Sequence, residues 1–404
     1  MVSAPFAGIS VLERAGFIAG PYCAKLLGDL GARVVKIEPP GAGDSARGFG
    51  PFPGDVPDRD QSGLFLYLAT NKRSVTLDSA LPAGRDLFTR LAATADVLVE
   101  DSCPGTAKPL GLDYATLQQA NPRLVYVSIT PYGQDGPRSQ WKAHHMNTFH
   151  AAGEGYTMPG GIGYTKFPDR APITGGAHVG EYDAGLMAAL ATVAALFARE
   201  VWGLGQQVDI SKQEATMALN RLTLANYFGI GQLNDRSRNY EYGGIYACKN
   251  GYVNVYPRED HQWRALAEVM GRPELAEQKR FLTRGDRIEH GAEANQIIRE
   301  WTATLNKDEI YHRLASKSCP ASPFATSEDV FNSPQLASRG FFAEVDHPKA
   351  GTLRYPSQPY QFSSCPRPAD SPAPLLGQHN EEILCGELGL TGKELTALRR
   401  GGVI

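Results

Sequence analysis

The stretch ISVLERAGFIAGPYCAKLLGDLGARVVKIE, residues 9–38, decides the fold class of this chain. It begins with a short apolar segment at residues 9–12, continues through a helical segment at residues 22–30 and ends with a β-branched segment at residues 33–38. Gly31 follows the helical segment at the position where many helices end. A strand, a helix and a second strand in this order indicate that the two strands pair in parallel.

The alternation continues outward from this stretch. Three further β-rich segments are predicted to be strands, at residues 74–78, 96–100 and 124–129, and a long helix at residues 181–199 precedes another strand at residues 207–210. Strands that alternate with helices indicate a parallel sheet with helices on both faces. The predicted fold class is therefore α/β.

The second half of the chain follows a different pattern. A chain of 404 residues exceeds the size at which a single core usually stops growing, so we expect two domains. Residues 1–215 form the predicted first domain, and residues 216–334, mostly helical with a small strand pair near Tyr246 and Tyr252, form a predicted smaller domain. Residues 335–404 are a proline-rich, strand-like segment followed by a last helix.

The composition argues against several kinds of partner. The 40 basic and 43 acidic residues leave a net charge of −3, which gives no general attraction for nucleic acid or an anionic membrane. The six cysteines are scattered without a CxxC pair, which favours reduced thiols over a disulfide scaffold or a zinc site. The longest apolar run, residues 184–198, is about five residues shorter than a membrane-spanning helix, and the N-terminus lacks the apolar run of a signal peptide. We expect a cytoplasmic protein that binds no metal ion, nucleic acid or membrane.

Common motifs of other enzyme classes are absent from the sequence. No GxGxxG joins a predicted strand to a helix, and no GxxxxGK[ST] or HExxH occurs, so a dehydrogenase, an NTPase and a zinc protease have no support. There is also no GxSxG nucleophile elbow of a serine hydrolase.

A series of short motifs spreads over nearly the whole chain. They lie at residues 19–22, 27–32, 35–40, 71–77, 96–100, 104–105, 110–113, 121–126, 132–137, 203–209 and 374–379. In this combination they resemble the class III CoA-transferases, a family that also includes α-methylacyl-CoA racemase. The resemblance implies a transferase that acts on an acyl-CoA and a carboxylic acid, with coenzyme A entering as part of the substrate and no cofactor bound permanently.

The resemblance also implies an architecture. In this family a large Rossmann-like domain is built from both chain ends, so residues 335–404 are expected to return to it, and a smaller domain lies in the middle of the chain. Two subunits interlock like the links of a chain. We therefore expect a homodimer, or a heteromer with a paralogous chain.

One carboxylate carries the chemistry that the resemblance implies. The family's catalytic aspartate lies four residues before a glycine, just ahead of a long alanine-rich helix, and Glu181 stands at that position here. A carboxylate can attack a thioester carbonyl and divide the exchange of CoA into easier covalent steps. Asp183 is the second choice, because its side chain takes a different face of the helix. The alternative is that both acids only cap the helix that begins near Ala184.

Cations are expected around CoA because it carries phosphate groups. By resemblance, Arg47, Lys72 and Arg73 are candidate CoA ligands, and Tyr132 is a candidate wall of the site. The alternative for each cation is a solvated surface charge. Cys103 stands where the family commonly has an arginine, so one cationic contact is missing.

Two adjacent histidines and two departures from the family pattern leave other functions open. His144 matches the histidine that works with the aspartate in the racemase branch, and His145 is a second candidate for the substrate pocket. Two groups on opposite sides of an α-carbon could exchange its proton, so an acyl-CoA racemase or epimerase is one alternative. The departures at Glu181 and Cys103 motivate another, a non-catalytic subunit or one that requires an active partner.

Overall fold

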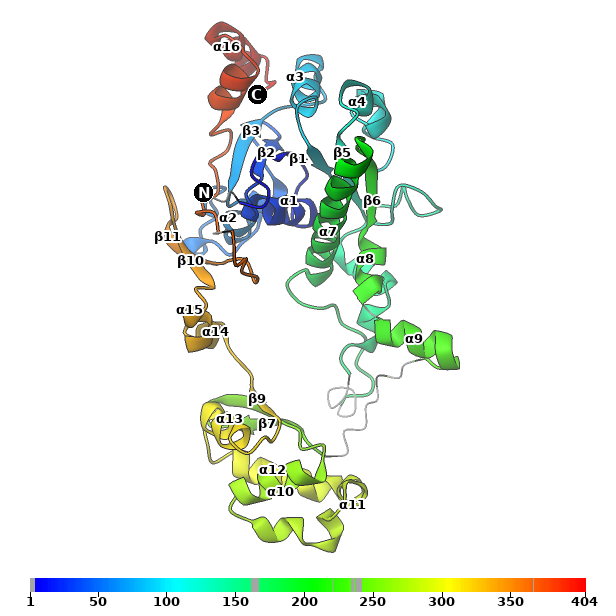
Figure 1. The fold of residues 1–404 in the computed structure, drawn as a ribbon, viewed down its shortest axis with the longest axis vertical. Helices are drawn as coiled ribbons and strands as arrows, with labels where there is room; N and C mark the ends of the chain where they lie inside the picture. Colours follow the sequence, from blue (N-terminus) through cyan, green and yellow to red (C-terminus); the bar gives the residue numbers. More distant parts are fainter. Residues whose placement is uncertain (1–3, 161–166, 220, 234–235, 237–241, 366) are drawn as a thin grey trace. The chain divides into compact units, whose positions relative to one another are not determined.

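The computed structural model describes residues 4–160, 167–219, 221–233, 236, 242–365 and 367–404 (Figure 1). The chain divides into two compact units. The first contains Met1–Met158, Pro172–Asn234 and Gly340–Ile404, and the second contains Pro159–Ala171 and Asp235–Arg339. The division of the chain into residues 1–215, 216–334 and 335–404 stays a prediction.

A six-stranded parallel sheet forms the centre of the first unit, which confirms the predicted α/β class. Its strands are β1 (Ser10–Arg14), β2 (Arg33–Glu38), β3 (Lys72–Thr76), β4 (Val97–Glu100), β5 (Val125–Thr130) and β6 (Gln207–Ser211). The spatial order is β3-β2-β1-β4-β5-β6, so the direction of winding reverses between β1 and β4. In open α/β sheets of this kind, ligands bind beyond the carboxyl ends of the strands at this reversal.

One face of the sheet is covered by α1 (Ala19–Asp29) and α7 (Val179–Trp202), which pack against each other. Small residues make this close packing possible. A Cβ atom on Gly185 of α7 would lie 2.6 Å from the carbonyl oxygen of Ala19. The core between these helices and the sheet is formed by buried valines, alanines and leucines such as Val11, Leu27 and Ala188.

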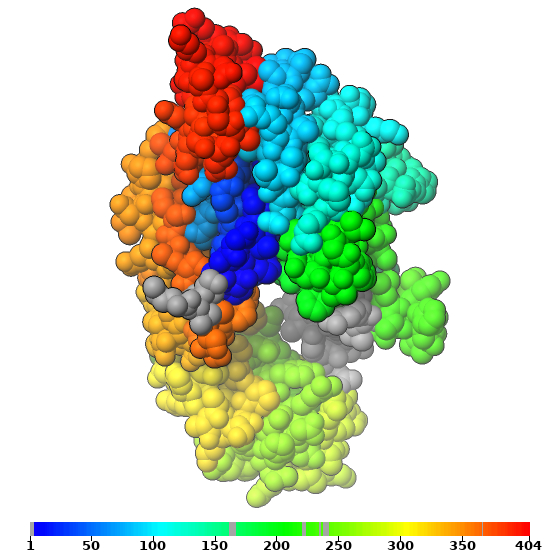
Figure 2. Space-filling model, turned by 45° about the horizontal axis from the view of Figure 1, so that its top comes forward, coloured from blue at the N-terminus to red at the C-terminus, as the bar shows by residue number. Residues whose placement is uncertain are grey.

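The opposite face is covered by α3 (Pro82–Ala92), α4 (Tyr114–Ala120) and the C-terminal segment, which contains the π-helical turn Glu381–Glu387 and α16 (Gly392–Arg400). Leu87, Ile383 and Leu395 belong to one buried cluster on this face. Figure 2 shows the C-terminal helix, in red, beside α3, in light blue. The two ends of the chain therefore share a core.

Shorter elements complete the first unit. They are α2 (Gly63–Leu68), α5 (His145–Ala151), α8 (Lys212–Leu219), α9 (Arg221–Ile230) and the antiparallel pair β10 (Phe342–His347) and β11 (Gly351–Pro356). Buried Val345 and Tyr355 of this pair pack with Phe65 of α2. The chain segment after the second unit is thus anchored to the N-terminal part.

The second unit is a small antiparallel sheet with helices. Its strands are β7 (Gly244–Cys248), β8 (Gly251–Val255) and β9 (Ala321–Pro323), and pairing of β7 with β8 confirms the predicted strand pair. Its helices are α10 (Asp260–Val269), α11 (Arg284–Glu289), α12 (Gly291–Thr302), α13 (Lys307–Ala315), α14 (Ser327–Phe331) and α15 (Pro334–Ser338). Trp263 and Phe281 lie fully buried in its core.

The long helix α7 extends at both ends beyond the apolar run of residues 184–198. Among the described residues, it is the one helix whose length and composition would allow it to cross a membrane. Core helices of folded domains meet the same criterion. Ala184, Ala188 and Leu196 of α7 are buried in the core of the first unit, which accounts for part of its apolar character.

Candidate active site

Glu181 lies in the first turn of α7 and is 3% exposed. Its Oε2 accepts a hydrogen bond from Nζ of Lys212 at 2.7 Å, and this contact is also an ion pair. Lys212 is the first residue of α8 and directly follows β6. The pair therefore joins the start of the long helix to the carboxyl end of a sheet strand, where α/β proteins commonly bind their ligands.

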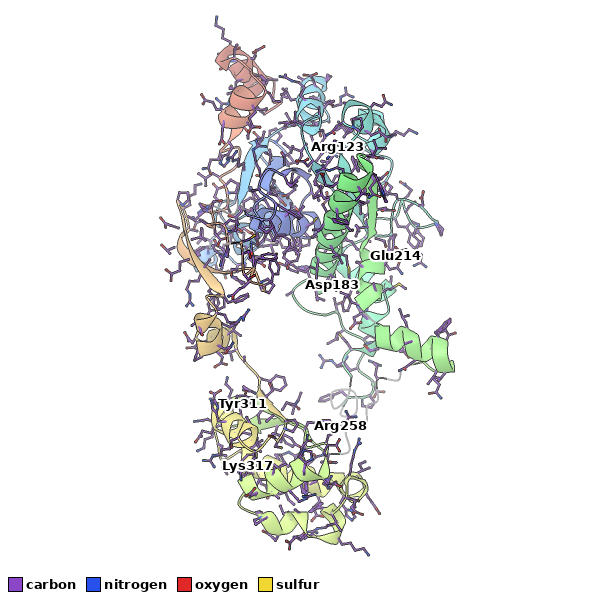
Figure 3. All side chains as sticks on the ribbon, in the orientation of Figure 1. Arg123, Asp183, Glu214, Arg258, Tyr311 and Lys317 are labelled. Atoms are coloured by element: carbon purple, nitrogen blue, oxygen red, sulfur yellow. The ribbon has the colours of Figure 1, made fainter. Side chains whose placement is uncertain are left out.

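Asp183, the second candidate, has different surroundings. Figure 3 labels it near the N-terminal end of α7, where it is half-buried. Burial raises the pKa of Asp183, and the negative charge of Glu154 raises it further. Asp183 makes no ion pair with any described residue, whereas Glu181 holds a buried one.

Three residues in the loops before α1 and α7 have left-handed backbone conformations. Ala177 and His178, which precede α7, both adopt left-handed conformations with φ of 55° and 56°, and Phe17, just before α1, has φ of 63°. Such conformations are uncommon for residues with a side chain and persist where the surrounding structure enforces them. The His178 ring lies 5.1 Å from the Phe17 ring and 5.4 Å from the His145 ring. These rings form an aromatic wall beside the start of α7.

His145, and not His144, is the histidine of this wall. His145 is buried, and its ring lies close enough to the start of α7 that a Cβ atom on Gly180 would come within 3.3 Å of it. Burial lowers the pKa of His145, against smaller raising effects from the Gly175 backbone and the Glu181 carboxylate. Neither ring nitrogen makes a hydrogen bond of ordinary geometry to a described residue. His144 is exposed, and its backbone N–H donates to Oδ1 of Asn147.

A cavity of about 480 Å³ opens at the carboxyl ends of the strands, on both sides of the reversal between β1 and β4. Its lining comes from the ends of four strands and the segments that follow them. The lining residues are Arg14, Ala15 and Gly16 at β1, residues 37–39 and 43–45 at β2, residues 77–80 after β3, and Asp101, Ser102 and Leu110 after β4. Since ligands of open α/β sheets bind at such a reversal, this cavity is the candidate binding site for an extended substrate.

None of the five charged residues that line the cavity, among them Arg14 and Asp101, was a predicted site residue. Arg14 is held by Ser79 and Ser102, whose hydroxyl oxygens accept hydrogen bonds from its guanidinium at 3.2 and 2.7 Å. Asp101 accepts the backbone N–H of Gly16 at 2.9 Å, and burial raises the pKa of Asp101 to about 6. Arg14 ends a strand, and Asp101 directly follows one. A search for polar residues at the ends of the predicted strands would have found them.

Asp101 also connects the cavity with the Glu181–Lys212 pair. The positive charge of Lys212 acts on Asp101 and opposes part of the effect that burial has on the pKa of this carboxyl group. Lys212, like Arg14 and Asp101, was not among the predicted site residues. It follows β6 as Asp101 follows β4.

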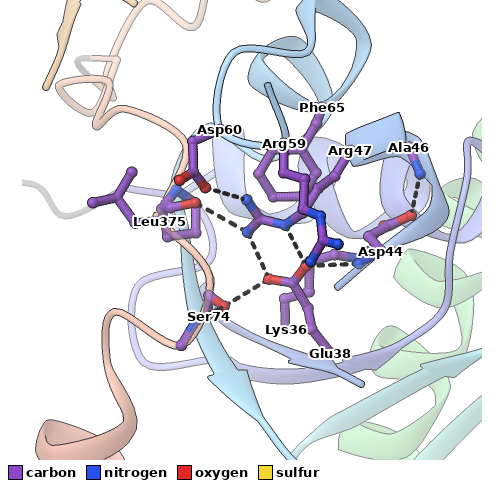
Figure 4. A network of polar contacts seen from close by, with 12 residues as sticks. Lys36, Glu38, Asp44, Ala46, Arg47, Arg59, Asp60, Phe65, Ser74 and Leu375 are labelled. Carbon is purple, nitrogen blue, oxygen red and sulfur yellow. Dashed lines mark hydrogen bonds and ion pairs between the residues drawn. The ribbon is translucent and has the colours of Figure 1, made fainter. Parts of the chain in front are cut away.

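Arg47 and Lys72 are held inside the fold and are not free to bind a phosphate group. Arg47 donates to both carboxylate oxygens of Glu38 at 2.7 and 2.8 Å and to Asp60 at 3.0 Å (Figure 4). Lys72 pairs with Glu13 at 2.7 Å and donates to a backbone carbonyl, and burial lowers the pKa of Lys72 to about 8. Their interpretation as CoA ligands gains no support from these contacts.

The remaining predicted residues lie outside the lining of the cavity. Arg73 is partly exposed and pairs with Glu382 at 3.1 Å, and the Tyr132 ring packs edge-on against Trp141 with centroids 6.4 Å apart. Cys103 is exposed. Within the described ranges, no group of three histidine, cysteine or acidic side chains is arranged to hold a metal ion.

Comparisons with known proteins connect this geometry with a family. CoA-transferase family III matches residues 6–380 of the chain. The formyl-CoA:oxalate CoA-transferase of Streptomyces avermitilis is 35% identical, over 98% of each chain. The succinyl-CoA–L-malate CoA-transferase beta subunit of Chloroflexus aurantiacus is 33% identical, over 99% of this chain and 98% of the relative.

The fold is shared with a solved structure as well. The crystal structure of a CaiB/BaiF family protein from Brucella suis superimposes with a TM-score of 0.84 at 30% identity, over 95% of this chain and all of that one. Family match, relatives and fold agree over nearly the whole length. The chain is therefore a member of CoA-transferase family III and an enzyme that transfers coenzyme A.

Proposed function

We propose that the transfer of coenzyme A proceeds through covalent intermediates on Glu181. The observation that carries this proposal is the buried Glu181 carboxylate at the start of α7, with one oxygen held by Lys212. The N-terminal end of a helix also favours a negative charge. A carboxylate held in this way is oriented, as a nucleophile must be.

The reaction then runs in four chemical steps. A Glu181 oxygen attacks the carbonyl carbon of the acyl-CoA, a C–O bond forms, the C–S bond breaks and CoA leaves as a thiolate. The thiolate attacks the Glu181 carbonyl carbon of the resulting anhydride, which releases the donor acid and leaves a glutamyl–CoA thioester. The acceptor carboxylate repeats these two steps in reverse order and leaves as the new acyl-CoA. Together these covalent steps divide a difficult exchange between two weak nucleophiles into easier reactions.

The cavity at the carboxyl ends of β1 to β4 is the proposed site for the CoA moiety. Arg14 is the cation of its lining, fixed by Ser79 and Ser102. Of the four acids in the lining, Glu38 and Asp44 are already paired, with Arg47 and Lys36 respectively. Asp78 and Asp101 make no ion pair with a described residue, so we expect the phosphate groups to lie on the Arg14 side of the cavity. Arg73 and Tyr132 stay predicted CoA contacts.

The relatives suggest the class of acceptor. The names of the two relatives above contain oxalate and malate, which are both short dicarboxylic acids. We propose a short dicarboxylic acid as the acceptor for this chain. A panel of monocarboxylic and dicarboxylic acids, assayed with succinyl-CoA and formyl-CoA as donors, tests this choice.

Assembly with a second copy of the chain is proposed from α7. One face of this helix carries exposed apolar side chains that follow one another at spacings of three or four residues. They are Leu186, Leu190, Val193, Phe197 and Val201. An apolar stripe of this kind marks an interface. Light scattering should give a molecular mass twice that of one chain. Leu190→Glu should reduce this mass, whereas Leu282→Glu, at an exposed site of the second unit, should leave it unchanged. A chain that stays a monomer and retains activity would contradict this assembly, and one that gains activity only with a paralogue would favour a heteromer.

A second candidate function rests on His145. Its buried imidazole lies beside the start of α7, where it could exchange a proton of an acyl-CoA together with Glu181. Incorporation of deuterium at the α-carbon in deuterated water, without an acceptor acid, would identify such an isomerase. Transfer that requires an acceptor acid, with no α-exchange, supports the transferase mechanism.

Trapping of the intermediate tests the proposal directly. Intact-protein mass spectrometry after mixing with each acyl-CoA should detect an acyl or CoA adduct that hydroxylamine removes. Glu181→Gln should abolish the adduct, and the matched control Asp183→Asn should retain it. An adduct on Asp183 would show that the nucleophile is misassigned, and binding of CoA without any adduct would favour a partner-dependent subunit.

A further inference from the structure

The ion pair between Glu181 and Lys212 is buried, so its formation requires both charged groups to lose water. The side chains of Lys212 and Glu181 are 17% and 4% exposed, so both charges have largely left water. A buried ion pair gains little stability over an apolar pair of the same size, because desolvation offsets the attraction. A fold that retains such a pair at the start of its proposed nucleophile helix invites a functional explanation.

The contact distinguishes the two oxygens of Glu181. Lys212 holds Oε2, and no described residue donates a hydrogen bond to Oε1. Oε1 is thus the oxygen available to attack a thioester. Once Oε1 is bonded to the acyl group, Oε2 becomes the carbonyl oxygen of the anhydride.

In the second and third steps, Lys212 faces the oxygen of Glu181 on which charge develops. When a thiolate attacks the Glu181 carbonyl carbon, negative charge develops on Oε2 in the tetrahedral intermediate. Nζ of Lys212 lies 2.7 Å from that oxygen before the reaction begins. A donor placed in advance at an oxygen where charge develops is the arrangement of an oxyanion hole.

We propose that Lys212 is a catalytic residue that stabilises the oxyanion on Oε2 of Glu181 in the two steps that make and break the glutamyl–CoA thioester. This proposal rests on Glu181 as the nucleophile. In the second step the S–C bond to Glu181 forms, the C–O bond to the acyl group breaks and the donor carboxylate leaves with the electron pair. Lys212 retains its protons throughout, and no other reactant is required.

Asp101 has a supporting place in this arrangement. The anhydride and the thioester of Glu181 are both uncharged, so the Lys212 ammonium loses its partner in the intermediates. An unpaired charge in a buried position is costly. Asp101 directly follows β4 and Lys212 directly follows β6, so both lie at the carboxyl-end edge of the same sheet. The positive charge of Lys212 lowers the pKa of Asp101 against the effect of burial, and we expect Asp101 to compensate the ammonium while Glu181 is acylated.

Lys212 acts as an oxyanion donor in the second and third steps of the reaction. The first and last steps place the developing charge on the substrate carbonyl oxygen, where Lys212 has no role as a donor. Replacement of Lys212 by methionine should therefore slow formation of the thioester by about 100-fold, the usual loss for one oxyanion donor. Formation of the anhydride should be slowed less, because Lys212 contributes to that step only by orienting Glu181, so the anhydride should accumulate in the variant.

Quenched-flow mass spectrometry of one turnover tests this expectation. Wild type should accumulate the CoA adduct on Glu181, and Lys212→Met the acyl adduct. Lys212→Arg, which keeps the positive charge, should recover part of the rate of thioester formation. Lys317→Met is the matched control, because Lys317 pairs with Glu268 at 3.1 Å on the exposed surface of the second unit (Figure 3).

Three kinds of result distinguish the role of Lys212 from the role of Glu181. A CoA adduct that forms in Lys212→Met at the wild-type rate, or equal slowing of both adducts, would overturn the role of Lys212. Absence of any adduct in wild type would instead refute the nucleophile itself. If Lys212→Met does not fold, as judged by thermal unfolding, the ratio of the two adducts in Lys212→Arg decides: an unchanged ratio contradicts the proposal, and a shift toward the acyl adduct supports it.

Discussion

Replacement of Arg47 by methionine should destabilise the first unit without changing how the enzyme recognises the phosphate groups of CoA. Arg47 is 1% exposed, and its guanidinium stacks 3.7 Å from the Phe65 ring. It also donates to the backbone carbonyl of Pro374 at 3.1 Å, so it ties the C-terminal segment to the loop that follows β2. All of these contacts belong to the fold.

The size of the effect follows from the partners that the substitution leaves behind. Glu38 would stay fully buried and lose two charged hydrogen bonds, retaining those from Ser74 and the backbone of Asp44. Removal of one member of a buried ion pair typically costs about 3–5 kcal/mol. For a unit of this size, that free energy corresponds to a decrease in melting temperature of roughly 6–15 °C.

Two measurements on the same variant separate the structural role from a role in binding. Thermal unfolding followed by circular dichroism should show the decrease, and the ratio of KM values for an acyl-CoA and its 3′-dephospho analogue should stay at the wild-type value. Arg73→Met is the matched control. Its ion pair with Glu382 is exposed, so the free energy of unfolding should change by less than about 1 kcal/mol. An unchanged melting temperature of Arg47→Met together with a lost preference for the 3′-phosphate would refute the reasoning.

Two further predictions concern Asp101 and the packing of α7. Because burial raises the pKa of Asp101 from 3.8 to about 6, the folded protein holds a proton that the unfolded chain releases in this window. The stability that protonated Asp101 contributes is therefore present below pH 3.8 and is lost as the pH rises to about 6. The melting temperature of Asp101→Asn, relative to that of wild type, should rise between pH 3.8 and about 6 and then level off. A difference in melting temperature that does not change with pH would contradict the raised pKa of Asp101. Gly185→Val should cost about 1–3 kcal/mol in urea unfolding, because the added atoms meet α1, whereas Gly229→Ala, which faces open space on α9, should be neutral or slightly stabilising.

Local patterns were sufficient to predict most of the first unit. The β-branched run at β2 and the glycine after α1 were read correctly, and Gly31 indeed takes φ of 98° behind the end of the helix. Boundaries were less accurate, since α1 already begins at Ala19. The strand β3 begins two residues before the predicted start, at Lys72, because this residue already pairs with Val34 in the parallel ladder with β2.

The candidate site was only partly predictable, for a physical reason. Glu181 was predicted from the resemblance to the family, which places a carboxylate four residues before a glycine at the start of a long helix, and its catalytic role stays a prediction. Arg47 pairs with Glu38 across the turn after β2, and Lys72 of β3 reaches Glu13 of β1 past the intervening strand β2. Both pairs depend on the folded arrangement, so the sequence could not distinguish these cations from ligands of a phosphate. Lys212 and Asp101 come to the same edge of the sheet only through the order of the strands β4, β5 and β6. That order is a property of the folded sheet and not of any local motif.

The covalent role of Glu181 is tested most directly by an acceptor acid whose carboxylate carries heavy oxygen. In the proposed reaction, the acceptor oxygen that bridges the anhydride stays on Glu181 when the new acyl-CoA leaves. After one turnover, the peptide that contains Glu181 should carry one heavy oxygen atom, and the peptide from Lys212→Met should acquire it more slowly. Formation of the new acyl-CoA without any heavy oxygen on Glu181 would contradict the account.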